Sequence, residues 1–185
     1  MITQDFNREF ILSQLLDLSE LPILLTTEGL EIALQMANKI VEIFQGQKKL
    51  YIYGCDHYQH IARDLTQGFH SGLMINRPPL PVEFIEHLNE QEPFLTSLGQ
   101  QGKKGDGILI ISGEYTQLAE NLLKEAKAKN LFTLAFCGYP QLSNHQPELL
   151  FYLPIPNRPR LKEAFLMLGH IICTLVESTL YGNSF

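Results

Sequence analysis

The chain has 185 residues, 45% of them apolar and 18% charged, so it can build one domain with a core and is neither collagen-like nor disordered. Its net charge of −6 argues against nonspecific nucleic-acid binding, which needs a basic surface to neutralise phosphates. The charged fraction is below the roughly 25% of an average domain, which predicts that part of the surface is buried in an oligomer.

Cysteine usage and apolar runs indicate the compartment. The cysteines Cys55, Cys137 and Cys173 are far apart and include no CxxC motif, which disfavours a disulfide framework or a zinc finger. The charged N-terminus lacks the apolar core of a signal peptide. The longest uncharged apolar stretch, residues 164–176, is shorter than the about 20 residues that span a bilayer. We therefore expect a soluble cytoplasmic protein that binds no membrane.

The chain begins with helical periodicity. Apolar residues at helical spacing predict an amphipathic helix over residues 4–18. Pro22 breaks the short apolar connection 21–25 that follows. A second helix is predicted from residue 30, ending at Gly46.

The period then changes from helical to extended. Residues 49–54 (KLYIYG) predict a strand, and Asp56 is placed to cap a helix that runs to about residue 70. Residues 72–76 (GLMIN) predict a second strand. The segment 80–104 is ambiguous and suggests short helices.

Strands and helices alternate in the second half. Strands are predicted over 107–112, 131–138 and 149–155, and helices over 116–129 and 160–180. The unbroken apolar run GILIIS at 107–112 is typical of a strand buried on both faces. Strands joined by helical crossovers indicate an α/β protein whose parallel sheet carries helices on both faces. Ligands of such sheets bind at the carboxyl ends of the strands.

The last helix is apolar almost all round over residues 164–176. A helix without a polar face is buried on most sides, and in a small domain a partner chain is the expected cover. We expect one domain over 1–185, with helices in 1–46 used for oligomerisation and a core formed by 47–185. The expected assembly is a symmetric oligomer packed through the terminal helices.

Two loops at the expected carboxyl edge are candidate anion sites. Gly54, Cys55 and Asp56 follow the first strand and open a helix, whose N-terminal amides can hold an anion. An ordinary strand-to-helix turn explains the same residues. Cys55 at a helix N-terminus can have a lowered pKa, although a structural small residue is the simpler interpretation.

The second loop follows the buried strand. Ser112, Gly113 and Thr116 supply hydroxyls and amides that suit a phosphate. Ser112 or Thr116 can equally serve only as the N-cap of the next helix. Glu114 in the same loop adds negative charge and disfavours an anion.

Histidines supply the remaining candidates. His60 and Asp64 are four residues apart on a predicted helix, a spacing that suits metal ligation or an acid/base pair but also an ordinary surface contact. His170 lies in the apolar last helix, where a core histidine is the common outcome. Lys162 is eight positions earlier, on roughly the same helical face.

In order and spacing, several segments resemble the sugar isomerase (SIS) domain family, and within it the phosphoheptose isomerases and the related DnaA initiator-associating proteins. The longest is GDGILIISGEYTQLAENLLKEAKAKNLFTLAFCG, which is similar to the family's GDVLL–IS block with its following helix and strand. HIARDLT resembles the family's HFAEELT, and RPPLP and the final RLKEAFLMLGHIICTLVESTLYG also resemble family segments.

The resemblance implies a three-layer αβα sandwich with a flavodoxin-like five-stranded parallel sheet and an N-terminal helical extension. It implies a homotetramer with sites between subunits. In active members a glutamate and a histidine interconvert sedoheptulose 7-phosphate and a heptose phosphate by proton transfer, with zinc nearby. By position the catalytic pair falls on Asp64 and His170, the metal ligands on His60, Asp64 and His170, and the glutamine ligand on Lys162.

Departures from the family leave two functions open. The glycine-rich loop is shortened to GCDHYQ, the phosphate loop keeps two hydroxyls of four, and Lys162 can repel the zinc or replace its charge. One function is a non-catalytic sugar-phosphate sensor or interaction scaffold, with a replication initiator as a possible protein partner and no cofactor. The alternative is an active isomerase that uses Asp64 and His170.

Overall fold

The computed structural model of the chain describes residues 4–86, 101–114, 116–139 and 145–182. Within these residues five strands, all parallel, form one sheet in the order β2-β1-β3-β4-β5. The strands are β1 (Leu50–Gly54), β2 (Val82–Phe84), β3 (Gly107–Ser112), β4 (Phe132–Cys137) and β5 (Leu149–Tyr152). All six residues of the central strand β3 are buried, as its unbroken apolar run predicts.

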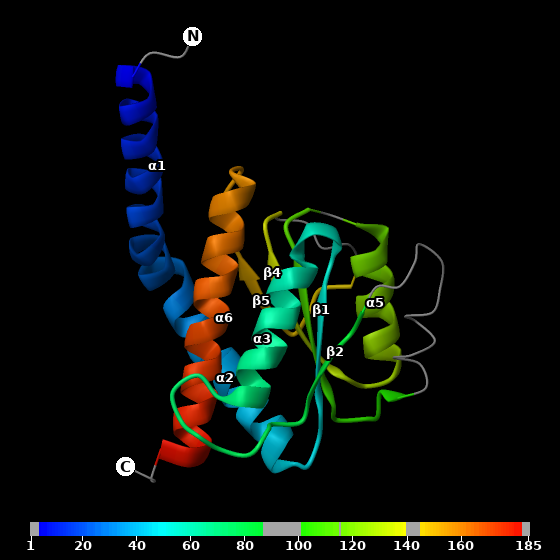
Figure 1. Ribbon diagram of the computed structural model, residues 1–185. Coiled ribbons are helices and arrows are strands. Elements are labelled where there is room, and N and C mark those ends of the chain that lie inside the picture. The colour runs from blue at the N-terminus through cyan, green and yellow to red at the C-terminus, as the bar shows by residue number, and fades with distance from the viewer. Residues whose placement is uncertain (1–3, 87–100, 115, 140–144, 183–185) are drawn as a thin grey trace.

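Helices cover both faces of the sheet. The helices α2 (Leu30–Gln45), α3 (Gln59–Ser71) and α6 (Arg158–Tyr181) lie on one face and α5 (Gln117–Ala128) on the other (Figure 1). The larger apolar core lies under the three helices and the smaller one under α5. The three-layer αβα sandwich with a parallel sheet is therefore confirmed.

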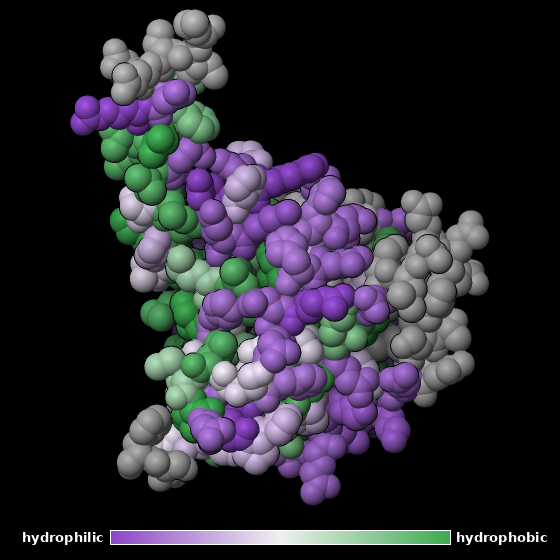
Figure 2. Space-filling view, viewed as in Figure 1, coloured by the Kyte–Doolittle hydropathy of each residue, from purple (hydrophilic) through white to green (hydrophobic). Residues whose placement is uncertain are grey.

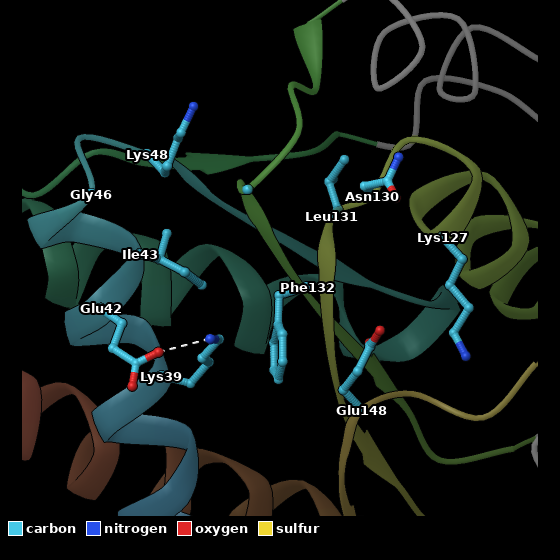
Figure 3. Close-up of a pocket in the computed structure, with 11 residues that line it drawn as sticks. Lys39, Glu42, Ile43, Gly46, Lys48, Lys127, Asn130, Leu131, Phe132 and Glu148 are labelled. Atoms are coloured by element: carbon cyan, nitrogen blue, oxygen red, sulfur yellow. Dashed lines mark hydrogen bonds and ion pairs between the residues drawn. The ribbon is translucent and has the colours of Figure 1, made fainter.

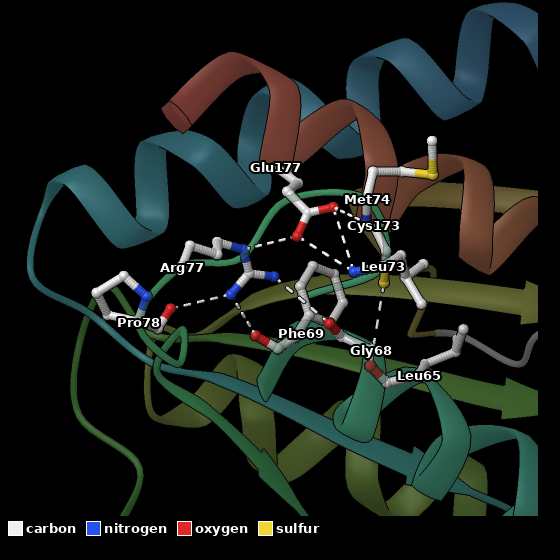
Figure 4. Close-up of polar contacts among 9 residues, drawn as sticks. All are labelled: Leu65, Gly68, Phe69, Leu73, Met74, Arg77, Pro78, Cys173 and Glu177. Atoms are coloured by element: carbon white, nitrogen blue, oxygen red, sulfur yellow. Dashed lines mark hydrogen bonds and ion pairs between the residues drawn. The ribbon is translucent and has the colours of Figure 1, made fainter. Parts of the chain in front are cut away.

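The segment 72–76 does not form the predicted strand. The Glu177 carboxylate of α6 accepts hydrogen bonds from the amides of Leu73 (3.2 Å) and Met74 (2.9 Å), and from Arg77 Nε at 2.9 Å (Figure 4). Backbone donors that a strand would give to a neighbour thus go to a side chain about 100 residues away. The second strand lies later, at β2, where Leu50 pairs with Val82.

The N-terminal helix does not break at Pro22. The helix α1 (Gln4–Leu24) contains Pro22 and passes through a π-helical turn, Leu25–Gly29, into α2. Pro22 is therefore accommodated within the helix, and the interruption comes after it. The short helices suggested within 80–104 lie mostly outside the described residues, and β2 is found near the start of that segment.

The N-terminal helix stands away from the body, and apolar side chains gather along the edge that carries it (Figures 1 and 2). Its exposed large apolar residues are Phe6, Phe10, Ile11, Leu12, Leu15, Leu16, Leu18 and Ile23. By contrast α6 is largely covered by its own chain, through α2 and α3. The unpartnered apolar surface therefore lies chiefly on α1, although Ile171 of α6 is also exposed, and packing through both terminal helices stays a prediction.

Two helical segments are long and apolar enough to cross a membrane by length and composition, Phe6–Gln45 and Arg158–Tyr181. The uncharged apolar run 164–176 lies within the second of these segments and remains shorter than a bilayer span. Packing on the sheet explains the hydropathy of α2 and α6. It does not explain that of α1, whose large apolar side chains are exposed.

Candidate functional site

Two of the predicted site residues meet across two helices. Asp64 on α3 and His170 on α6 lie 106 positions apart in the sequence, yet Asp64 Oδ2 is 2.7 Å from His170 Nε2. Both side chains are about half exposed, at 55% and 41%. A carboxylate bonded to an accessible imidazole can exchange protons with a bound molecule.

A cavity of about 710 Å³ lies beside this pair. Its lining comes mainly from α3 and the turn before it, with one residue from α6. The lining residues are Asp56, His57, Gln59, His60, Arg63, Asp64, Gln67 and, from α6, Lys162. This volume is within the range of small-molecule sites. Lys162 Nζ lies 5.7 Å from the centre of the Tyr58 ring, while Arg63 is paired with Glu86 at 2.9 Å.

The predicted metal ligands His60, Asp64 and His170 do not assemble into a zinc site in this chain. In the described ranges no group of three or more His, Cys, Asp or Glu side chains is placed to hold a metal ion. The Asp64 carboxylate is bonded to His170, and Lys162 offers donors only. This donor set does not fit zinc, which takes at least three protein ligands.

The β1–α3 turn is built for close packing. A Cβ on Gly54 would lie 2.2 Å from the carbonyl oxygen of Tyr58, so only glycine fits there. Asp56 has φ of 45° and begins a 3₁₀ turn, Asp56–Tyr58, in which no side chain caps the following helix. The predicted Asp56 cap is therefore wrong, because the extra turn separates Asp56 from the start of α3.

Cys55 in this turn is buried and is not an activated thiol. It is 1% exposed, and burial raises its pKa to about 12, with hydrogen bonds to Ser112 and Thr116 opposing the rise. The suggested lowering of the Cys55 pKa by a helix N-terminus is therefore wrong, because desolvation dominates. A ligand in the cavity does not reach this side chain.

The hydroxyls of the β3–α5 loop are engaged within the protein. Ser112 is 1% exposed, and its Oγ donates to the carbonyl oxygen of Glu114. Thr116 caps α5, with Oγ1 accepting from the Ala119 amide at 3.1 Å. The N-cap interpretation thus holds for Thr116. At the mouth of the loop, the Glu114 carboxylate pairs with the Arg158 guanidinium.

Tyr58 lies directly on the glycine of that loop. A Cβ on Gly113 would be 1.8 Å from the Tyr58 hydroxyl oxygen and 2.3 Å from Cζ. The ring also packs against Phe165, with centroids 5.8 Å apart. Burial raises the pKa of Tyr58, Glu114 adds to the rise and Arg158 opposes it. Sequence analysis missed Tyr58 as a site residue, because only Gly113, about 55 positions away, signals the contact.

A second cavity, of about 670 Å³, lies at the opposite, amino edge of the sheet (Figure 3). Lys39 pairs with Glu42 at 2.7 Å and lies over the Phe132 ring, while Lys48 and Lys127 lie at separate margins (Figure 3). Because these ammonium groups do not converge on one point, this hollow is not assembled like an anion site.

The parallel sheet, its flanking helices and the carboxyl-edge cavity define an SIS-fold protein. No family model matches the chain. Curated relatives include the phosphoheptose isomerases of Burkholderia pseudomallei strain 1710b, 30% identical over 68% of each chain, and of Aneurinibacillus thermoaerophilus, 27% identical over 88% of this chain and 89% of that one. The chain belongs to the phosphoheptose isomerase family.

Solved structures share the fold. A phosphoheptose isomerase from Francisella tularensis has a TM-score of 0.84 and 18% identity, and the match covers 93% of this chain and 98% of that one. HobA from Helicobacter pylori has a TM-score of 0.72 and 14% identity, covering 97% and 96%. At these identities the structures support the fold alone, so function rests on the site.

Proposed function

We propose that this chain is a member of the phosphoheptose isomerase family without isomerase activity, which acts in the cytoplasm as an interaction scaffold of the initiator-associating type. The observation that carries this proposal is that the hydroxyl groups of the β3–α5 loop are hydrogen-bonded within the protein. The two hydroxyls that the sequence assigns there to a phosphate, those of Ser112 and Thr116, have partners within the protein, and Gly113 lies against the Tyr58 ring.

The physical argument is one of donors and charge. A phosphate at a helix N-terminus needs free hydroxyls or amides and a positive field. Here Ser112 donates to a backbone carbonyl, Thr116 caps α5, and Glu114 places a carboxylate at the mouth. Arg158, the nearby cation, is held by Glu114. A sugar phosphate entering this loop would first have to break these contacts, which favours a scaffold over a sensor.

The proposed partners are other protein chains. The resemblance to initiator-associating proteins suggests a replication initiator, and the HobA structure, which aligns over 97% of this chain, is consistent with that branch. Binding to the replication initiator of the source organism can be measured by biolayer interferometry. Saturable binding supports this assignment, and its absence across the micromolar range contradicts it.

We also propose self-association through the N-terminal helices, into the tetramer that the family resemblance implies. An apolar groove of about 320 Å³ lies between α2 and α6 and continues from the exposed face of α1. Its lining is Pro22, Leu25, Thr26, Gly29, Leu30, Ala33, Leu34, Met167, Leu168, Ile171 and Leu175. A surface this apolar is the kind that a second copy covers.

Turnover of sedoheptulose 7-phosphate tests the loss of activity. We expect the purified protein to isomerise this substrate no faster than its His170→Ala variant. A thermal-shift titration with the same sugar phosphate should show no rise in Tm, although a ligand at 100 times its Kd would add about 2.7 kcal/mol. Turnover clearly above that of the variant would contradict the proposal.

The alternative is an active, metal-independent isomerase, favoured by the 2.7 Å contact between Asp64 and His170. In that chemistry Asp64 removes a proton from the hydroxyl-bearing carbon next to the substrate carbonyl, and His170 delivers a proton to the former carbonyl carbon. The proton of the neighbouring hydroxyl passes to the former carbonyl oxygen, so that the carbonyl moves by one carbon. The Lys162 ammonium, which lines the same cavity, would stabilise the enediolate charge. Asp64→Asn should then abolish turnover while leaving the assembly unchanged, and unchanged turnover excludes this alternative.

A further inference from the structure

We infer that Tyr58 is the specificity-determining residue that closes the β3–α5 loop to phosphate. Its phenol occupies the space against Gly113, in the loop between β3 and the N-cap of α5, which is the loop that the sequence assigns to a phosphate. The loop is thus an anion site that the chain fills with its own side chain. This inference rests on the proposed loss of activity and adds a side chain that fills the loop to the internal contacts of Ser112, Thr116 and Glu114.

The contacts place the end of the ring on the loop backbone. The Tyr58 hydroxyl lies 1.8 Å from the position that a Gly113 Cβ would take. The loop leads into α5, a helix of 12 residues, through its cap Thr116. The first amides of a helix carry partial positive charge and favour an anion. A phenol, which is neutral at physiological pH, gains little from that field.

A second observation concerns the hydroxyl itself. Tyr58 is only 5% exposed, and within the described part of the chain its hydroxyl oxygen has no hydrogen-bond partner. A buried hydroxyl without a partner is unfavourable, so such groups are rare in native proteins. Here the unpaired hydroxyl lies against Gly113, in the loop that leads to Thr116, the N-cap of α5.

Two glycines accommodate this tyrosine. A Cβ on Gly54 would collide with the Tyr58 carbonyl oxygen at 2.2 Å, and a Cβ on Gly113 would collide with its hydroxyl. These glycines lie in the two loops that the sequence predicts as anion sites. In this structure both leave room for Tyr58, and the ring is held on its other side by Phe165.

The test removes the ring and supplies inorganic phosphate. We expect Tyr58→Ala to bind phosphate at least tenfold more tightly than the unaltered protein, measured by isothermal titration calorimetry. Adding Ser112→Ala to Tyr58→Ala should remove the gain, which locates the phosphate at this loop. Tyr152→Ala, at a half-buried tyrosine on the edge strand β5, is the matched control and should leave phosphate binding unchanged.

A second variant keeps the test decisive if Tyr58→Ala does not fold. Tyr58→Leu keeps an apolar side chain against Phe165 but removes the ring end at Gly113, and it should show the same gain if Tyr58→Ala is unfolded. No gain in either folded variant overturns the inference. Phosphate binding by the unaltered protein that Tyr58→Phe weakens would also overturn it, because the hydroxyl would then be a ligand. Turnover by the unaltered protein contradicts the proposed function instead, so the two failures are distinguishable.

Discussion

At the scale of single residues, close contacts between residues far apart in the sequence determine the candidate site. The main example is the contact between Tyr58 and Gly113. The Tyr58 hydroxyl lies so close to Gly113 that any larger residue at position 113 would place its Cβ on it. Asp64 and His170 are a second pair, and the sequence placed both in the site through the family resemblance. No periodicity or spacing predicts the Tyr58 contact, since it joins two loops through tertiary packing.

The Gly113 contact gives a prediction about stability. Gly113→Ala should lower the free energy of unfolding by about 1–3 kcal/mol, the usual cost of overpacking, because the new methyl collides with Tyr58. In a Tyr58→Ala background the same change should cost far less, and the coupling can be read from urea unfolding as a double-mutant cycle. Equal costs in both backgrounds would mean that Tyr58 does not lie on Gly113.

The cysteines give a prediction about reactivity. Cys55, Cys137 and Cys173 are free and buried, and burial raises the pKa of each thiol, to about 12 for Cys55 and Cys137. The native protein should therefore react slowly with Ellman's reagent at pH 8, whereas all three thiols should react rapidly once unfolded in urea. Rapid reaction of a native thiol would show that at least one of them is exposed.

At the scale of elements, local pattern predicts most boundaries and fails where a distant side chain intervenes. The apolar run of β3 and the periodicity of α5 gave ranges within one residue of the structure. The segment 72–76 is equally apolar, but Glu177 binds its amides from α6. Gly72, with φ of +77°, turns the backbone out of α3 at this point.

The Glu177 contact gives a prediction at this scale. Glu177 and Arg77 form a 2.9 Å ion pair with both side chains 1% exposed, and Arg77 also donates to the Phe69 carbonyl oxygen at 2.8 Å. Glu177→Ala should cost about 3–5 kcal/mol, because it leaves a buried guanidinium without its counter-charge.

Urea unfolding measures this cost against a matched control. Glu83→Ala removes the partner of Lys49 from a pair with side chains 51% and 37% exposed, and it should cost less than about 1 kcal/mol. A cost for Glu177→Ala as small as that of the control would contradict the role given to the buried pair.

At the scale of the whole molecule, the exposed apolar face of α1 is the feature that a lone chain does not explain. Leu15 and Leu16 are 57% and 64% exposed, on a helix that stands away from the sheet (Figure 1). Fully burying such a side chain contributes about 1.5–3 kcal/mol, which supports the proposed association through α1.

Leu15→Glu combined with Leu16→Glu should therefore convert the assembly to smaller species in sedimentation velocity, because charges do not bury at an apolar interface. The control is Gln117→Glu on α5, an exposed position on the opposite face of the sheet, and it should sediment like the unaltered protein. An unaltered protein that sediments as a monomer would contradict the proposed self-association.

The sequence by itself determined the fold class and the central strands, because apolar period and motif order are local properties of the chain. The family resemblance placed Asp64 and His170 in one site, and the structure brings their side chains within 2.7 Å. Tertiary structure alone decided three further points: the path of residues 72–76, the interior packing of α6, and the closure of the β3–α5 loop by Tyr58. Each depends on contacts between residues tens of positions apart. Such contacts are fixed by how the helices pack on the sheet, which no local pattern encodes.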